Sequence, residues 1–238
     1  MLKTITHKLR DNSGFGLMEM AVTLAILGLI FSTVIETIGL MNNRFKQNLN
    51  VVRIYKIQQA LKGYYVRHGK LPCPAIPGGA IGEAVKSCQT KDAVGYIPFK
   101  TLGLPDVTSK NGFNHLFTYS VTPLYTKSNA PHCQTSSSGL KVIDENNVPV
   151  LDKEYPLMYV LVDHGVKGGG SFLNEKTIGH KTVVDPLEIT NSEHTPIFRH
   201  GQQHKIDHKV IFETRDDFMR EINKPCTSPT ISPQTSGV

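Results

Sequence analysis

The longest apolar run without a charged residue extends from Met20 to Ile35, directly after Glu19. Neighbouring apolar positions extend this 16-residue run to residues 15–41, which is long enough for a helix that crosses a bilayer. Further on, apolar residues recur at spacings of three and four, as on one buried face of a helix. They are Ile54, Ile57, Leu61 and Tyr64, and Leu61, Tyr64 and the adjacent Tyr65 are expected to pack in the core. The pattern predicts one helix of roughly 50 residues, and the alternative is two helices divided near Asn42 and Asn43.

After residue 68 the pattern changes to short segments bounded by proline and glycine. Pro72 and Pro74 end the helix, because proline lacks the backbone donor. Residues 157–162 form the most apolar of these segments and are predicted to be the central strand of a sheet. Further strands are expected at 116–122, 181–184 and 209–212, and a weak hairpin at 141–143 and 148–151. Thr214, with Asp217 three residues on, predicts the start of a short helix.

Composition limits the classes of protein to which the chain can belong. Only 39% of the 238 residues are apolar and tryptophan is absent, which excludes a membrane protein with many spans. The net charge of +6 is modest, so contact with anionic lipid or nucleic acid is permitted but not required. Nucleic acid is therefore not an expected partner.

The first 19 residues combine features that an ordinary secretory signal lacks. A basic leader, residues 1–14, ends at Gly14, which stands before the apolar run, whereas secretory cleavage sites follow it. Glu19 lies inside the extended segment 15–41, and a carboxylate in hydrocarbon costs roughly 2.5 to 3.5 kcal/mol and needs a partner.

These residues resemble the type IV prepilin motif, with Gly14 at the cleavage position, Phe15 as the first mature residue and Glu19 as the fifth. The resemblance implies cleavage after Gly14 and methylation of the Phe15 amine by a prepilin peptidase. It also implies assembly with other pilin or pseudopilin subunits, with Glu19 facing the Phe15 amine of a neighbour. Two such charges away from water are tolerable only when they are paired. The implied location is the bacterial inner membrane, with a single span and a periplasmic C-terminal domain.

A second resemblance covers residues 71–121 and is less specific. Leu-Pro-Cys-Pro at 71–74, the block at 95–105 and an aromatic strand at 113–121 are similar to a subgroup of pilin-like proteins. Asn111 and Asn114 stand where that pattern usually has aspartate and glycine. The turn before the strand is therefore expected to differ.

The four cysteines are Cys73, Cys88, Cys133 and Cys226. An even number in an extracytoplasmic domain predicts up to two disulfides, and four cysteines allow three connectivities. A bridge from Cys73 to Cys88 would close a glycine-rich loop, and one from Cys133 to Cys226 would hold the C-terminal end.

Candidate chemistry in the remaining chain is weak. His200, His204 and His208 are spaced four apart and are weak candidates for a metal site, but Gly201 and the strand expected at 209–212 oppose a helix. Calcium needs six to eight oxygens, and near the glycine-rich loop only Asp163 and Glu175 carry carboxylates. No arrangement typical of a catalytic site is present, so we expect neither an enzyme nor a cofactor.

The predicted fold class is α+β, with a long N-terminal helix packed on an antiparallel β-sheet. The expected parts are a leader at 1–14, a transmembrane half-helix at 15–41, an amphipathic half-helix at 42–68, a globular domain at 69–226 and a disordered tail at 227–238. The predicted function is that of a minor pilin or type II secretion pseudopilin. The alternative is a membrane-anchored extracytoplasmic domain that binds a metal or nucleic acid and is processed by the same route.

Overall fold

A computed structural model describes most of the chain beyond the leader. Its two compact units are Met1–Phe45 and Lys46–Val238. The predictions for Gly14, Phe15, His204 and the tail at 227–238 lie outside the described residues. The described residues are 16–89, 93–128, 133, 139–151, 156–177, 179–183, 185–192, 195–201 and 207–226.

Helix α1 spans Leu17–His68 and is continuous through Asn42 and Asn43, as its pattern predicted. It ends at Gly69, which adopts a φ of 67° and donates its N–H to the Tyr65 carbonyl at 2.8 Å. Glycine takes this left-handed conformation without the steric penalty of a Cβ. Pro72 follows and prevents the helix from resuming.

In residues 17–45 of α1, every position whose burial is described is exposed. Large apolar side chains are included, with exposures of 93% for Leu17 and 60% for Phe31. Within the described ranges, no helix combines the length and apolar character of a membrane span.

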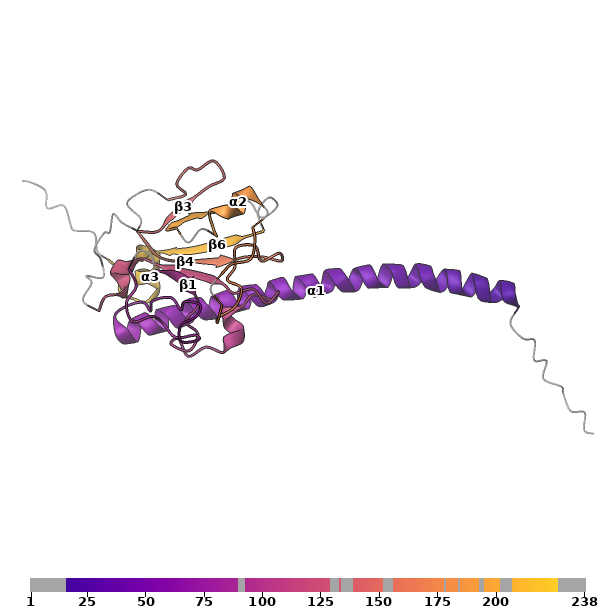
Figure 1. Ribbon diagram of the computed structural model, residues 1–238, viewed down its shortest axis with the longest axis horizontal. Coiled ribbons are helices and arrows are strands. Elements are labelled where there is room, and N and C mark those ends of the chain that lie inside the picture. Colours follow the sequence, from indigo (N-terminus) through magenta and orange to yellow (C-terminus); the bar gives the residue numbers. More distant parts are fainter. Residues whose placement is uncertain are drawn as a thin grey trace, which may run out of the picture. The chain divides into compact units, whose positions relative to one another are not determined.

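A four-stranded antiparallel sheet forms the centre of the second unit (Figure 1). Its order is β1-β2-β4-β6, so β4 lies between two partners, as its apolar run predicted. The α+β class with an antiparallel sheet is thus confirmed. The strands are β1 at Val94–Tyr96, β2 at Thr118–Val121, β4 at Leu157–Asp163 and β6 at Lys209–Thr214.

The smaller elements depart more from expectation. Residues 148–151 turn back on β3, since Val150 N–H donates to the Val142 carbonyl at 2.9 Å, but the partner strand of β3 is β5, in parallel. These elements are β3 at Lys141–Ile143, β5 at Ile197–Arg199, α2 at Pro186–Ile189, α3 at Arg215–Glu221, and the 3₁₀ turns η1 at Asp106–Ser109 and η2 at Pro123–Thr126. Thr214 caps α3 as predicted, by accepting the Asp217 N–H.

The prediction of a strand at 181–184 was wrong for the residues that are described, because residues 181–183 are irregular. The reason is a local pairing. Lys181 N–H donates to the Ser171 carbonyl at 2.9 Å and its carbonyl accepts the Gly170 N–H at 2.8 Å, so it pairs with the loop that follows β4.

Two clusters of buried side chains cover the two faces of the sheet. Because side chains alternate along a strand, β4 sends Tyr159 and Leu161 toward α1 and Val160 and Val162 toward β3 and β5. The α1 face consists of Ile54, Ile57, Leu61 and Tyr65. Leu61 and Tyr65 are deeply buried, as predicted, and Tyr64 is partly buried and packs against the same cluster.

Candidate functional site

Glu19 is the described residue of the predicted processing and assembly site. It is exposed and lies in the first turn of α1. A carboxylate there interacts favourably with the unpaired N–H groups and the partial positive charge of the helix start. The backbone at the start of α1 therefore accommodates the charge of Glu19.

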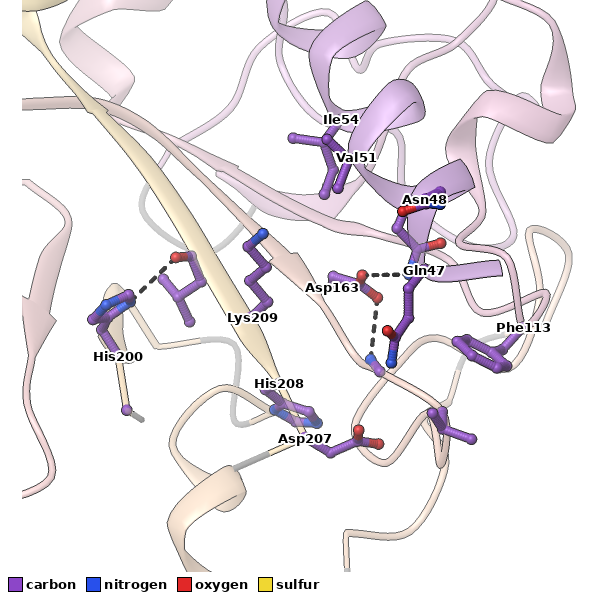
Figure 2. Close-up of a pocket in the computed structure, with 15 residues that line it drawn as sticks. Gln47, Asn48, Val51, Ile54, Phe113, Asp163, His200, Asp207, His208 and Lys209 are labelled. Carbon is purple, nitrogen blue, oxygen red and sulfur yellow. Dashed lines mark hydrogen bonds between the residues drawn. The ribbon is translucent and has the colours of Figure 1, made fainter. Parts of the chain in front are cut away.

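A buried polar network begins at Asp163, at the end of β4. Its Oδ2 accepts a hydrogen bond from Asn50 Nδ2 of α1 at 2.8 Å (Figure 2). Its Oδ1 accepts one from Asn111 Nδ2 at 2.7 Å. Gly165 N–H donates to Oδ1 at 3.1 Å. Burial raises the pKa of Asp163, and these hydrogen bonds oppose the rise. Asp163 thus fastens α1 to two loops.

Asp163 and Glu175, the carboxylates considered for calcium, have different partners. Glu175 pairs with Lys110, with Oε1 2.7 Å from Nζ. Burial raises the pKa of Glu175, but the Lys110 hydrogen bond and charge outweigh burial, so the pKa is lowered. The two carboxylates are thus held by separate groups.

The loop at 111–115 fits closely against α1. Gly112 N–H donates to Asn50 Oδ1 at 2.5 Å, and Arg53 Nη1 donates to the Asn111 carbonyl at 2.8 Å. A Cβ at Gly112 would lie 2.5 Å from the Lys46 carbonyl oxygen, so this position requires glycine. Asn114 has a φ of 66°, a conformation that asparagine tolerates better than most residues. Asparagine therefore serves where glycine was expected.

A depression of about 550 Å³ lies beside this network, within the size range of small-molecule sites. Its wall on α1 includes Gln47 and Asn48, and Phe113, His200 and Lys209 line other parts (Figure 2). The lining mixes amide, cationic and aromatic side chains. This arrangement can hold a polar ligand.

A second polar cluster joins α1 to β6 and α3. Lys62 Nζ lies 2.8 Å from Glu213 Oε1 and also pairs with Glu221, while the Tyr159 hydroxyl donates to Glu213 Oε2. Burial lowers the pKa of Lys62, but the hydrogen bonds and charges of Glu213 and Glu221 outweigh burial, so the pKa is raised. A lysine on the helix thus neutralises a glutamate on the sheet.

The predicted histidine cluster is only partly described, because His204 lies outside the described residues. His200 is exposed, with Nδ1 3.3 Å from the Val210 carbonyl oxygen, whereas His208 is buried just before β6. Among the described residues, no group of three or more His, Cys, Asp or Glu is placed to hold a metal ion.

Two disulfides are present, and they realise one of the three possible connectivities. Cys73 bonds to Cys88 across 15 residues, and Cys133 bonds to Cys226 across 93. Arg215 Nη1 of α3 donates to the Cys133 carbonyl at 2.8 Å, which further ties this bridge to the domain. The second disulfide holds the chain after α3.

No known protein family, curated protein or solved structure matches the chain. The buried polar groups centred on Asp163 and Lys62 share one role, because each joins elements that are distant in sequence. Asn50 and Lys62 were not identified from the sequence. A polar residue on an otherwise apolar, buried face of a helix is the signal that could have pointed to them. Glu188, a buried carboxylate in α2, was also missed.

Proposed function

We propose that the chain is a structural subunit of a membrane-rooted filament, either a minor pilin or a type II secretion pseudopilin. In this proposal a prepilin peptidase cuts after Gly14, and the mature chain begins at Phe15. Residues 15–41 lie in the bacterial inner membrane before assembly, and the globular domain faces the periplasm. Other pilin or pseudopilin subunits are the partners.

The observation that carries the proposal is the exposed apolar surface on the first half of α1. Apolar surface in water costs roughly 25 cal/mol per Å², and contiguous patches of this extent mark contact with a membrane or another protein. The large exposed side chains are Leu17, Met18, Met20, Val22, Leu24, Ile26, Leu27, Leu29, Ile30, Phe31, Ile35, Ile38, Met41 and Phe45. Lipid covers this surface before assembly, and helices of neighbouring subunits cover it afterwards.

The second half of α1 supports a mechanical role. Asn50 ties it to β4, Arg53 to the loop at 110–111, and Lys62 to β6 and α3. Force applied along the helix is therefore passed to the sheet through polar contacts as well as apolar packing. A subunit that is pulled by its helix needs such fastening.

Mass spectrometry of the mature N-terminus tests the processing step. We expect a chain that starts at Phe15 and carries one added methyl group. An intact Met1, or cleavage after the apolar run, contradicts the proposal.

Glu19→Val tests assembly. With cleavage retained, we expect the variant to be lost from isolated filaments, because its neighbour's Phe15 amine has no carboxylate to face. Glu83→Val, at an exposed position in the domain, is the matched control and should assemble normally. Normal incorporation of Glu19→Val contradicts the assembly role.

The depression beside α1, with Lys209 in its lining, favours the second candidate, an anchored extracytoplasmic domain that binds a polar ligand such as nucleic acid. That role predicts that Lys209→Ala abolishes function without affecting filament incorporation, while Glu19→Val leaves function intact. The filament role predicts the reverse for Glu19→Val.

A further inference from the structure

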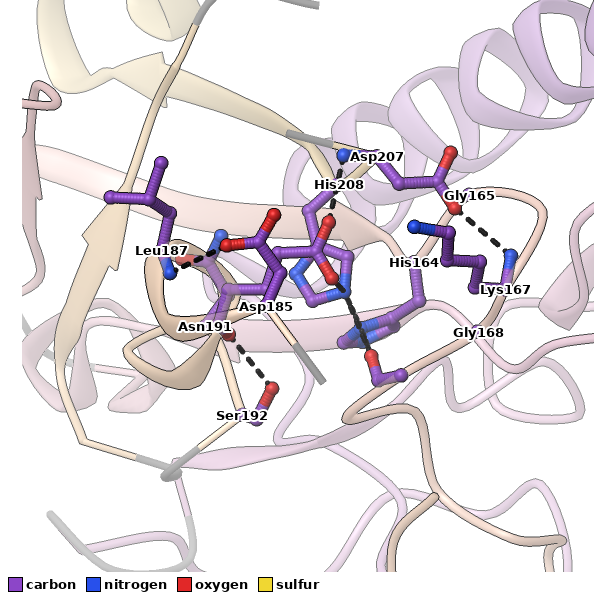
Figure 3. Close-up of polar contacts among 12 residues, drawn as sticks. His164, Gly165, Lys167, Gly168, Asp185, Leu187, Asn191, Ser192, Asp207 and His208 are labelled. Carbon is purple, nitrogen blue, oxygen red and sulfur yellow. Dashed lines mark hydrogen bonds and ion pairs between the residues drawn. The ribbon is translucent and has the colours of Figure 1, made fainter. Parts of the chain in front are cut away.

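A buried group of polar side chains on the β3–β5 side of the domain has no role in the proposed filament. It lies where the loop after β4, helix α2 and the start of β6 meet, and Figure 3 shows His164, His208 and Asp207 there. Glu188 of α2 is 3% exposed, and its Oε1 accepts the Asp207 N–H at 2.7 Å. Its Oε2 lies 3.5 Å from His208 Nε2. A single carboxylate thus holds α2 against the residues before β6.

Two imidazoles face one acceptor in this group. His164 Nδ1 and His208 Nε2 donate to the same Gly169 carbonyl oxygen, at 2.9 and 2.8 Å, and these two nitrogens are 3.4 Å apart. Because His164 donates through Nδ1, its Nε2 in the neutral form accepts the Thr118 hydroxyl at 2.8 Å. The contacts of His164 therefore suit an uncharged ring.

His208 is also held in a form that suits a neutral ring. Its side chain is fully buried, and its Nδ1 has no hydrogen-bond partner among the described residues. In the neutral ring Nδ1 is an unpaired acceptor, whereas protonation makes it an unpaired donor and also places a positive charge in a buried site, which costs more. The closed arrangement therefore opposes a charge on this ring.

We propose that His208 and Glu188 form an acid-sensitive latch, which holds residues 185–192 against the start of β6 at neutral pH and releases them when His208 is protonated. The hinge is Asn191, which exchanges two hydrogen bonds with the Arg199 backbone, at 2.6 and 3.0 Å, and stays attached to β5. Release changes the surface around α2, where a second depression of about 560 Å³ is lined by Gly169, Asp185 and Glu188.

Charges on each element packed against His208 decide the direction of the response. Glu188 of α2, Asp207 beside the ring and Asp163 at the end of β4 attract a proton, whereas the neighbouring N–H of His164 repels it. Burial has the largest effect and outweighs the carboxylates, so the pKa of His208 is lowered from its ordinary 6.5. The closed state, in which residues 185–192 are held against β6, then binds fewer protons than the open state, in which they are released. Closure is fully favoured above pH 6.5 and is lost as the pH falls below it.

Hydrogen exchange of the oxidised full chain in detergent, read by mass spectrometry and corrected for intrinsic exchange, tests the latch. Each pH unit below 6.5 multiplies the opening equilibrium by up to about tenfold, so the limit at pH 5.0 is about 30-fold relative to pH 7.5. We expect residues 185–192 to lose protection between pH 7.5 and pH 5.0, by a factor that does not exceed this limit, while β4 keeps its own. Unchanged protection of residues 185–192 overturns the proposal.

Three variants localise the effect. His208→Gln keeps an N–H donor for the Gly169 carbonyl but does not titrate, so the protection of residues 185–192 in this variant should not depend on pH. His68→Gln changes an exposed histidine and is the control, which should respond as the wild type does. Glu188→Gln still accepts the Asp207 N–H but no longer attracts the proton, so its loss of protection between pH 7.5 and 5.0 should exceed that of the wild type. If His208→Gln does not fold, the size of the loss of protection in Glu188→Gln is the test of the latch. Wild-type acid sensitivity in His208→Gln, or a smaller loss in Glu188→Gln, refutes the latch.

Discussion

Replacing Lys62 by methionine tests how α1 is joined to the sheet. Methionine keeps a linear apolar stem but removes the ammonium group that lies 2.8 Å from Glu213 Oε1. The two side chains are only 11% and 7% exposed, so water cannot take over the role of the lysine. Glu213 would keep the Tyr159 hydroxyl as its hydrogen-bond donor, with no cation beside it.

The expected cost follows from burial. Removing one partner of a buried ion pair costs about 3–5 kcal/mol, because the other charge is left uncompensated. Glu221, the second partner of Lys62, is 55% exposed and turns to water without penalty, so we expect the lower end, about 3 kcal/mol. For a unit of this size that corresponds to a fall in Tm of about 6–12 °C.

Thermal unfolding followed by near-ultraviolet circular dichroism measures this loss, because the buried tyrosines give a signal that depends on tertiary packing. Lys56→Met is the matched control on an exposed part of the same helix and should change Tm little. The double variant Lys62→Met/Glu213→Gln should recover at least half of the loss, since no charge remains buried. A Tm for Lys62→Met within 1 °C of the control, or a double variant less stable than the single one, refutes the reasoning.

Two further predictions concern covalent and steric constraints. Replacing Cys133 and Cys226 by serine should lower the free energy of unfolding by about 4–5 kcal/mol, because that disulfide closes a long loop. Replacing Cys73 and Cys88 by serine should lower it by about 3 kcal/mol. Equal Tm values for the two variants under non-reducing conditions would contradict the loop-entropy argument. Gly112→Ala should lower Tm because its Cβ would approach the Lys46 carbonyl to 2.5 Å, while Gly28→Ala, with no atom within 4 Å of the new Cβ, should not. Gly112→Ala with unchanged Tm contradicts the close fit.

The periodic pattern predicted α1 and its buried face, but it did not show which of two adjacent tyrosines at the end of that face is the more deeply buried. Tyr64 continues a spacing of three from Leu61, yet Tyr65 is the side chain that packs on Phe218, with ring centroids 5.2 Å apart. An α-helix has 3.6 residues per turn, so a residue three or four positions after Leu61 can lie on the same face. The position of α3 decides between them.

Short strands were the least predictable part. The apolar run of β4 identified a central strand, whereas β1 and β5 have only three residues each and went unrecognised. A strand of this length has little pattern of its own. It exists because a neighbour supplies its hydrogen bonds, as β2 does for β1 and β3 does for β5.

The sequence by itself determined the long helix, the central strand, the even number of cysteines and the N-terminal motif around Gly14 and Glu19, which stays a prediction. These depend on residues that are neighbours in the chain, where period and composition carry the information. Tertiary structure alone decided the pairs Asn50–Asp163 and Glu188–His208 and which cysteines bond. Asn50 and Asp163 are 113 residues apart, and no local pattern links such residues, because only the packing of α1 and the loops on the sheet brings them together.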